Sequence, residues 1–321
     1  MSNIIAFDIG GTHFRVGLFD RAGGQISALE GETLRSGGRE WMLRELKDRA
    51  ETLRRSSQEP VTACGVSFGG PVNFARQSVT SVHTPGWDDF ALSNWMVESL
   101  GLPCRVDNDA NAGALGEYRF GAGRGSESMI YLTLSTGIGG GIICHGQLHR
   151  GKDGTAGEIG HLPLCDADSL CTCGLYSGCT EALASGRSLD RKAREFAANH
   201  PKQAARIIEL AGGKAEAVTA RELVRAAQED DPAAANLFNV AIGWLARALL
   251  IAIRLLDPDK IVLGGGVTQA GGFLLRSLDS HLKRWWSPQF PYSTEIVLAQ
   301  LGSYSPLYGA AALALESTWR P

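Results

Sequence analysis

Residues 4–12 read IIAFDIGGT, a short apolar run that ends in an aspartate and a pair of glycines. An apolar run stopped by glycines predicts a buried β-strand followed by a tight turn. Residues 129–141 read MIYLTLSTGIGGG and repeat the order of strand and glycine turn, with the turn expected at 136–141. Residues 260–266 read KIVLGGG and end another strand in the same way. Two halves built on one plan predict an α/β fold with two similar domains facing each other across a cleft.

The composition is that of a globular protein with about two domains. The chain has 321 residues, of which 44% are hydrophobic and 20% charged, and its formal net charge is −3. A nearly balanced charge without a basic block argues against binding to nucleic acid or to an anionic membrane. The uncharged apolar stretch at residues 248–253 of the C-terminal half is well short of the roughly 20 residues that span a bilayer. Since the N-terminus also has no secretory pattern, we expect a soluble, cytoplasmic protein.

Hydrophobic periodicity predicts alternating strands and helices along the whole chain. A capping box opens a helix at Thr219, and Asp231 followed by Pro232 predicts the start of a long apolar helix that ends near Asp257. The other expected helices cover residues 40–56, 92–100, 109–118 and 306–316. The other expected strands cover residues 15–19, 25–29, 62–68, 104–107 and 142–144.

The three glycine turns allow backbone N–H groups to approach phosphate oxygens, because no Cβ intervenes. Each turn alone is more simply explained as a structural feature, but three of them, with hydroxyls at Thr12 and Thr136, favour a nucleotide phosphate site. The chain has no P-loop motif. Residues 137–142 match the dinucleotide-binding motif only loosely, without the acidic residue expected about 20 residues later. A Rossmann dehydrogenase is therefore disfavoured.

Asp8 closes the first strand and is expected to point into the first glycine turn. A carboxylate beside phosphate-binding amides repels an anion unless a cation intervenes. Mg²⁺, held by carboxylates, waters and substrate phosphates, resolves that conflict. The alternative is an aspartate that caps its own turn.

Residues 107–111 read DNDAN and place two carboxylates and two amides at a strand-to-helix junction. Binding crevices of α/β folds lie at such strand ends. A carboxylate in this position can accept the proton of an alcohol whose oxygen attacks phosphorus. A simpler role for Asp109 is to cap the following helix, and the two roles are compatible.

One histidine and three cysteines lie close together in the sequence at His161, Cys171, Cys173 and Cys179. This set suits a closed tetrahedral zinc site, which is structural because its four ligands are complete. Disulfides are disfavoured by the expected compartment and by the odd total of seven cysteines. The remaining thiols are expected in the core, with Cys165 kept as a substitute ligand; they are Cys64, Cys104, Cys144 and Cys165.

Two glutamates, Glu158 and Glu181, frame this segment. Carboxylates held near a metal-fixed histidine suit the recognition of a polyol, because each hydroxyl needs both a donor and an acceptor. Taken singly, each glutamate is more simply a solvated surface residue.

Together these motifs resemble those of the ROK family of sugar kinases and repressors, within the actin–hexokinase–Hsp70 ATPase fold. The resemblance spans nearly the whole chain and is carried by residues 8–12, 85–87, 108–111, 136–141, 158–161, 171–181 and 263–266. It implies an α/β fold of two ribonuclease-H-like domains of the actin-like ATPase type that face a central cleft. The expected domains are 1–118 completed by the C-terminal helix 305–321, and 119–304 with the zinc loop.

The resemblance also implies an activity, an ATP-dependent hexose kinase that transfers the γ-phosphate to the C6 hydroxyl, most directly that of glucose. Asp109 would be the general base, and Asp8 would act through Mg²⁺. The residues that would bind sugar are Gly70, Asn108, Asp109, Glu158, His161 and Glu181. Those that would bind the nucleotide are Asp8, Gly10, Gly11, Thr12, Thr136, Gly137, Gly265 and Gly266. Structural Zn²⁺ would be held by His161, Cys171, Cys173 and Cys179, and a homodimer is the family expectation.

The chain departs from the family pattern at a few positions. The loop from Cys173 to Cys179 is one residue longer than the common CxCGxxGC, and His83 stands where many relatives have asparagine near the sugar. The alternatives within the family are kinases for N-acetylmannosamine, N-acetylglucosamine, fructose or allose, which differ in pocket shape. A repressor would carry a DNA-binding segment for which there is no room before Gly10, which leaves a sugar-binding regulator without such a segment as the remote alternative.

Overall fold

The computed structural model describes residues 2–81, 84–166, 171, 173–175 and 178–317, so His83 lies outside the described residues. The chain divides into two compact units. Unit 1 comprises residues 1–131, 141–156 and 299–321, and unit 2 comprises residues 132–140 and 157–298. The predicted domain boundaries, after residues 118 and 304, stay a prediction.

Unit 1 is built on a five-stranded sheet with the order β3-β2-β1-β4-β7. β1 pairs antiparallel with β2 and parallel with β4, and β7 continues the sheet parallel to β4. The strands are β1 (Asn3–Ile9), β2 (His13–Phe19), β3 (Gln25–Glu32), β4 (Val61–Phe68) and β7 (Cys104–Asn108). A small hairpin, β5 (Val72–Asn73) with β6 (Ser78–Val79), follows β4.

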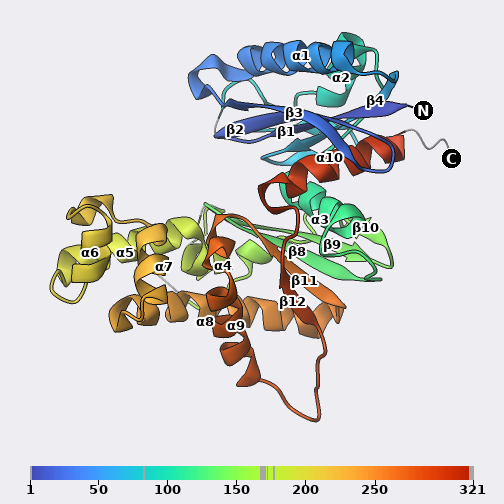
Figure 1. Ribbon diagram of the computed structural model, residues 1–321. Coiled ribbons are helices and arrows are strands. Elements are labelled where there is room, and N and C mark those ends of the chain that lie inside the picture. Colours follow the sequence, from blue (N-terminus) through green and yellow to red (C-terminus); the bar gives the residue numbers. More distant parts are fainter. Residues whose placement is uncertain (1, 82–83, 167–170, 172, 176–177, 318–321) are drawn as a thin grey trace. The chain divides into compact units, whose positions relative to one another are not determined.

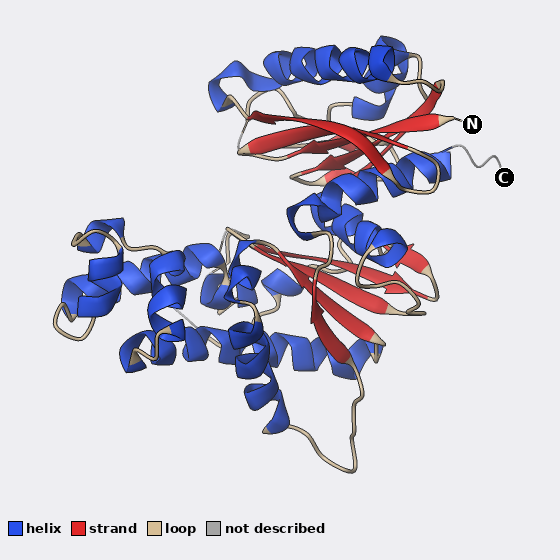
Figure 2. Cartoon of the chain, viewed as in Figure 1, coloured by secondary structure: helices blue, strands red, loops and turns tan. Residues whose placement is uncertain are grey.

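Both faces of this sheet are covered, which explains why β1 is apolar at nearly every position. Ile5 and Phe7 belong to the core beneath α1 (Gly38–Ser56) and α2 (Leu92–Leu100), whereas Ile4 belongs to the opposite core, with α10 (Ser305–Ser317). Figures 1 and 2 show α1 and α2 on one side of the sheet and α10 on the other. The strands and helices predicted in this part of the chain are all present.

Glycines let α10 pack with its backbone against the backbones of β4 and of α3 (Asp109–Phe120). A Cβ on Gly309 would lie 1.7 Å from the carbonyl oxygen of Ala112, and one on Gly65 would lie 2.0 Å from that of Ala310. A Cβ on Gly116 would lie 2.3 Å from the carbonyl oxygen of Ser305. Part of the high glycine content therefore serves helix packing and not turns.

The second sheet has the order β10-β9-β8-β11-β12, which repeats the strand order of the first sheet. This confirms that the two halves share one plan. The pairing repeats as well, since β10 is antiparallel to β9 and β12 is parallel to β11. The strands are β8 (Met129–Leu134), β9 (Ile138–Cys144), β10 (Gln147–His149), β11 (Lys260–Gly264) and β12 (Glu295–Leu298).

The expected glycine turn at residues 136–141 was too long, because β9 already begins at Ile138. Gly140 and Gly141 therefore lie inside a strand. They are glycines because of close neighbours: a Cβ on Gly140 would lie 2.4 Å from the carbonyl oxygen of Gly157, and one on Gly141 would lie 2.7 Å from that of Ala110. The turn itself is confined to residues 135–137.

The remainder of unit 2 is mainly helical. Thr219 forms the predicted capping box with Glu222, and Asp231 caps the long helix by accepting from the N–H of Ala234, with Pro232 in the first turn. The helices are α4 (Thr180–Ala184), α5 (Gly186–Asn199), α6 (Ala205–Leu210), α7 (Ala220–Gln228), α8 (Pro232–Leu256) and α9 (Gly272–Lys283). By length and composition α8 could cross a membrane, but it packs against α4, α7 and α9 as a core helix does.

Glu117, near the end of α3, is fully buried and fastens the segment by which the chain returns to unit 1 after β12. Its carboxylate accepts hydrogen bonds from the backbone N–H groups of Gln300 (3.1 Å) and Leu301 (2.9 Å). It also accepts from the N–H of Ala122 (2.8 Å) and the hydroxyl of Ser305 (2.6 Å). This carboxylate is therefore held by four neutral donors.

Replacing Glu117 by glutamine should destabilise the protein by about 2–4 kcal/mol, because an amide nitrogen cannot accept from N–H groups that stay buried. Chemical unfolding would measure the loss. Glu316→Gln, at a partly exposed position on α10, is the control and should change stability by no more than about 0.5 kcal/mol. Equal stabilities of the two variants would show that the Glu117 contacts contribute nothing.

Candidate functional site

Three parallel strands of unit 1 end with polar side chains at one edge of the sheet. In the strand register Asp8 of β1 lies opposite Ser67 of β4, and Ser67 lies opposite Asp107 of β7. All three residues are buried. Because ligands of open α/β folds bind beyond the carboxyl ends of such strands, this edge is the first part of the candidate site.

Asp8 accepts hydrogen bonds from the Ser67 hydroxyl at 3.0 Å and from the Arg15 guanidinium at 3.4 Å. Burial raises the pKa of Asp8 to about 6, the nearby negative charge of Asp109 adds to this, and Ser67 and Arg15 oppose it. In the adjacent turn, the N–H of Gly10 donates to the carbonyl of His13 at 3.0 Å. Asp8 is therefore bound to neighbouring side chains, in contrast to the alternative of a cap on its own turn.

The β7–α3 junction presents Asn108 and Asp109, both half-buried. The expectation that Asp109 caps α3 was wrong: Asn108 is the cap, and its side-chain oxygen accepts from the N–H of Asn111 at 2.7 Å. Asn108 thus satisfies one of the free N–H groups at the start of α3. Asp109 is the first residue of α3, and its charge acts on Asp8.

The other predicted residues of unit 1 lie in loops that follow strands. Gly11 and Thr12 are exposed in the turn between β1 and β2. Gly70 follows β4, and its N–H donates to the carbonyl of Phe68 at 2.9 Å. A Cβ on Gly70 would lie 2.7 Å from the carbonyl oxygen of Thr80, so this position requires glycine.

In unit 2 the structure brings Glu181, on α4, to the glycine turn before β9. Its carboxylate accepts from the N–H of Ile138 at 2.9 Å, and a Cβ on Gly137 would lie 2.4 Å from the same carboxylate oxygen. Thr136, in that turn, is exposed. The carboxylate of Glu181, a candidate sugar-binding residue, therefore packs directly against this turn.

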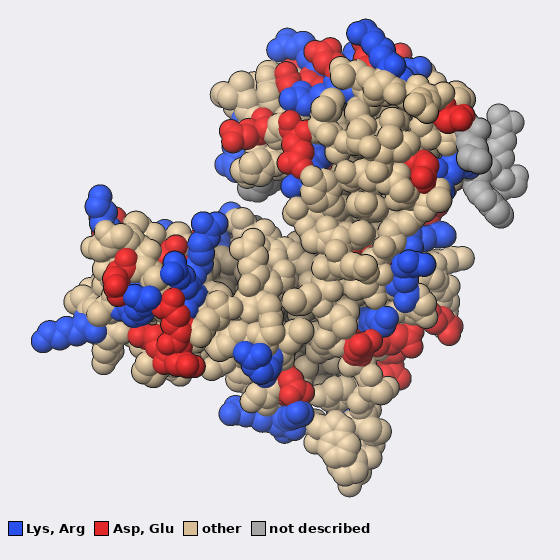
Figure 3. All heavy atoms as spheres, in the orientation of Figure 1, with Lys and Arg blue, Asp and Glu red and all other residues tan. Residues whose placement is uncertain are grey.

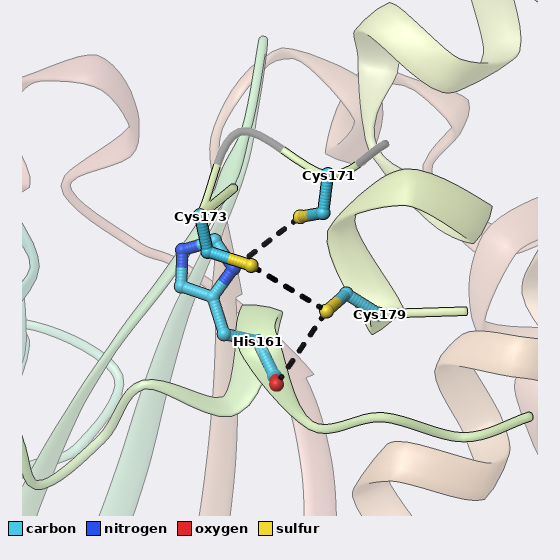
Figure 4. Close-up of side chains that lie close together, drawn as sticks. All are labelled: His161, Cys171, Cys173 and Cys179. Atoms are coloured by element: carbon cyan, nitrogen blue, oxygen red, sulfur yellow. Dashed lines mark hydrogen bonds between the residues drawn. The ribbon is translucent and has the colours of Figure 1, made fainter. Parts of the chain in front are cut away.

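Glu158 and His161 lie at either end of a short 3-10 turn, Ile159–His161. The Glu158 carboxylate lies 3.8 Å from Nε2 of His161, and its side chain is about half exposed. His161 faces the three cysteines with its other ring nitrogen, Nδ1, which lies 3.6 Å from Sγ of Cys171 (Figure 4). His161 therefore lies between Glu158 and the cysteine cluster.

The ligand atoms of His161, Cys171, Cys173 and Cys179 all lie within 4.8 Å of one another. Sγ of Cys173 and Sγ of Cys179 are 3.8 Å apart. A tetrahedron with Zn–S bonds of about 2.3 Å and Zn–N bonds of about 2.05 Å has S–S edges of about 3.8 Å and S–N edges of about 3.6 Å. The Cys173–Cys179 and His161–Cys171 separations match these edges, so the four residues could hold a zinc ion despite the longer Cys173–Cys179 loop.

At Cys173 the local environment also favours the form of the thiol that binds zinc. A hydrogen bond from the backbone of Leu175 lowers the pKa of Cys173, and the thiolate is the metal ligand. Cys165 is not part of the four-residue cluster. Cys64 and Cys104 are buried in the core of unit 1 as expected, whereas Cys144 and Cys165 are only half-buried.

Gly265 and Gly266 follow β11. Gly265 has a φ of +88°, and a Cβ there would lie 2.5 Å from the carbonyl oxygen of Leu134. After the next 3-10 turn lies a cavity of about 590 Å³, a volume suited to a small ligand. Its polar lining includes the side chains of Gln228, Asp230, Gln269 and Arg276.

Sequence reasoning missed three polar partners in the site, namely Arg15, Ser67 and Arg150. The strand register places Ser67 beside Asp8. Aligning the two predicted parallel strands would therefore have predicted Ser67 as a partner of Asp8. Arg150 forms an ion pair with Asp107 across 43 positions of sequence, and no local pattern announces such a contact.

The two sheets of shared topology, each with a glycine turn beyond its first strand, define the fold of the actin-like ATPases. A family model described as "ROK family" matches residues 4–317. The chain belongs to the ROK family.

Individual relatives agree with this assignment. A glucokinase of Streptomyces coelicolor is 34% identical over 98% of both chains. The crystal structure of a ROK family glucokinase from Streptomyces griseus in complex with glucose and AMPPNP is 34% identical, with a TM-score of 0.84 over 98% of this chain and 100% of that one. A ROK hexokinase from Thermus thermophilus is 35% identical, with a TM-score of 0.83 over 97% of both chains.

Asp8→Asn should stabilise the protein at neutral pH. The carboxyl has a folded-state pKa of about 6, against 3.8 for an unperturbed aspartate, so folding takes up protons between these pH values. The stability of the wild type therefore falls as the pH rises from about 4 to 6. Above pH 6 it stays lower than it is at pH 4. Asparagine removes this cost of up to about 3 kcal/mol.

Chemical unfolding of Asp8→Asn and wild type at pH 4.5 and pH 7.5, without added Mg²⁺, measures this effect. The advantage of the variant should be larger at pH 7.5. Asp153→Asn, at an exposed position, is the control and should show no such pH dependence. A difference between Asp8→Asn and wild type that is the same at both pH values would contradict the raised pKa.

Proposed function

We propose that the protein is an ATP-dependent hexose kinase that transfers the γ-phosphate of ATP to the C6 hydroxyl of glucose. The observation that carries this proposal is the arrangement at the β7–α3 junction. There Asn108 caps the helix, and the Asp109 carboxylate stands at the first position of α3, within the electrostatic influence of Asp8. This is a proton acceptor placed beside a candidate phosphate site.

In the proposed reaction Asp109 accepts the proton of the sugar hydroxyl while the hydroxyl oxygen attacks the γ-phosphorus. The bond between that phosphorus and the bridging oxygen breaks, and ADP carries away the electron pair. Phosphoryl transfer depends mainly on positioning and charge stabilisation. Mg²⁺, when bound with ATP, neutralises phosphate charge, and Asp8 is the residue of unit 1 that would hold it.

The residues proposed to bind sugar hydroxyls fall into two groups. Gly70, Asn108 and Asp109 belong to unit 1, and Glu158, His161 and Glu181 belong to unit 2. Carboxylates and an imidazole can accept from and donate to sugar hydroxyls. The hydrogen bond from Ile138 to Glu181 fixes one of these carboxylates in advance, which reduces the entropy lost on binding.

The nucleotide would be held by the glycine turns. Gly10, Gly11 and Thr12 of unit 1, and Thr136 and Gly137 of unit 2, would bind the phosphates through N–H and hydroxyl groups. Gly265 and Gly266 would flank the adenosine, and the cavity of about 590 Å³ after that turn supplies room for a base or ribose.

The charge distribution and the family suggest the partners. Figure 3 shows Lys and Arg interspersed with Asp and Glu on the face in view, so this face does not form the basic patch that is typical of nucleic-acid binding. The proposal includes a cytoplasmic location and a homodimer, with hexose and ATP as the small-molecule partners.

A panel of sugars with Mg-ATP tests the function directly. ADP release should be fastest with glucose, compared with mannose, fructose, allose, N-acetylglucosamine and N-acetylmannosamine. Another sugar as the dominant acceptor would replace glucose and keep the kinase. Sugar binding without ADP release would favour a sugar-binding regulator, and neither binding nor release would refute the proposal.

Asp109→Asn should lower kcat for glucose by at least about 100-fold, because the amide cannot accept the proton. Glucose affinity, measured by calorimetry, should stay within about threefold of wild type. Asp48→Asn, at an exposed position on α1, is the matched control and should keep full activity. Near-normal turnover by Asp109→Asn would remove Asp109 from its proposed role.

The proposal also includes one structural Zn²⁺ held by His161, Cys171, Cys173 and Cys179. Metal analysis should find about one zinc per chain in wild type and in Cys165→Ser, and much less in Cys179→Ser. Loss of zinc should lower Tm by roughly 5–10 °C and weaken glucose binding, because zinc binding contributes to folding. Full activity in protein shown to be free of zinc would contradict this assignment.

A further inference from the structure

Arg150 follows β10 and lies within unit 1, where its guanidinium contacts two different segments. Nε donates to Oδ2 of Asp107 at 2.7 Å. The guanidinium carbon also lies 3.5 Å from the centre of the Phe74 ring. The side chain of Arg150 is 20% exposed, so the ion pair and the stacking contact are largely shielded from water.

On the first side of Arg150, Asp107 connects the end of β7 to the first turn of α3. Its other carboxylate oxygen, Oδ1, accepts from the N–H of Asn108 and from the side-chain amide of Asn111, both at 2.9 Å. Asp107 is 1% exposed and Asn111 is 2% exposed. The orientation of the Asp107 carboxylate therefore sets the main chain at Asn108, one residue before the proposed base.

On the second side, Phe74 belongs to the loop between β5 and β6, and this loop is fastened to the same strand. The Gln77 side chain accepts from the N–H of Val106 at 2.7 Å and donates to the carbonyl of Val106 at 3.2 Å. It also donates to the carbonyl of Phe74 at 2.7 Å. Arg150 thus stacks on a loop that is itself anchored to β7, which restricts how far the guanidinium can move.

A purely structural need does not explain a charged pair at this place. Removing two charges from water is costly, and neutral side chains of similar volume often stabilise a fold equally well. What the charged pair adds is a short, directional contact to a carboxylate that already holds two groups of the β7–α3 junction. Such a contact is useful where a displacement of about 1 Å costs catalysis about 100-fold.

We propose that Arg150 is a positioning residue for the phosphoryl transfer, which it serves by orienting Asp107 and, through Asp107, the main chain that carries Asn108 and Asp109. This inference rests on the proposed function and adds to it a residue that touches neither sugar nor nucleotide. It predicts that Arg150 affects kcat more than the stability of the fold.

Three variants separate positioning from stability. Arg150→Met leaves Asp107 buried without a cation, so it should lower both Tm and kcat. Asp107→Asn combined with Arg150→Met removes the uncompensated charge, so its Tm should rise again towards the wild-type value. Its kcat for glucose should nevertheless stay about 10- to 100-fold below wild type, with KM for ATP within about twofold.

Arg150→Lys keeps the charge and hence the fold, but it loses the planar group that stacks on Phe74, and its kcat should fall about tenfold. Arg254→Met is the matched control, because Arg254 also lies over a phenylalanine, Phe290, in an exposed part of unit 2. It should keep the wild-type kcat. Each variant is assayed at a temperature where circular dichroism shows it to be folded.

The outcomes divide clearly. A double variant with recovered Tm and low kcat supports positioning, whereas recovery of both would show a structural role and overturn the inference. A wild-type kcat in Arg150→Met would overturn it as well. If neither methionine variant folds, Arg150→Lys provides the test. A wild-type Tm with a lowered kcat supports positioning, and a wild-type kcat overturns the inference. Failure of the wild type to phosphorylate any sugar would refute the proposed function instead, before any Arg150 variant is measured.

Discussion

The close approach of α10 to α3 and β4 is the constraint on which the rest of unit 1 depends. At Gly65, Gly116 and Gly309 a Cβ would lie 1.7 to 2.3 Å from a neighbouring carbonyl oxygen. Because these oxygens belong to the main chain, no side-chain rotation can remove the clash. The helices and the sheet therefore meet backbone to backbone, and this contact fixes where α3 lies on the sheet. Since Asp109 is the first residue of α3, the helix packing sets the position of the proposed base.

Among the residues that the structure describes in unit 1, three carboxylates are buried, and each is compensated in a different way. Glu117 accepts from four neutral donors, and Asp107 has a cation and two hydrogen bonds, so both are well satisfied. Asp8 has Ser67 and a longer contact to Arg15, and its pKa is raised. A buried carboxylate that is costly to ionise marks a functional site more than a structural one. Glu117 and Asp107 hold the main chain around them in place, and Asp8 is the carboxylate that we propose would hold Mg²⁺.

Local signals in the sequence predicted the structure correctly where the conformation of a segment depends on its own residues. The apolar runs gave the strands, and the Thr219 capping box and the Asp231–Pro232 pair gave two helix starts. These signals failed where the conformation depends on a contact with residues distant in the sequence. Glycine 140 reads as a turn residue, yet it lies in β9 because it must approach the Gly157 carbonyl. Asn108 and Asp109 are both good caps, and the contact between Asp107 and Arg150 has no signature in the sequence.

In unit 2, a metal bound by the cysteine cluster would hold the candidate site residues in place, as the glycine contacts hold α3 in unit 1. The described residues between Gly157 and Thr180 include one short 3-10 turn and an isolated bridge between Pro163 and Cys179, and these described residues form little other regular structure. His161 lies three residues after Glu158, and Cys179 lies two residues before Glu181. A metal held by His161 and Cys179 would therefore fix both glutamates at once. Its coordinate bonds would replace the apolar core that so short a segment cannot build.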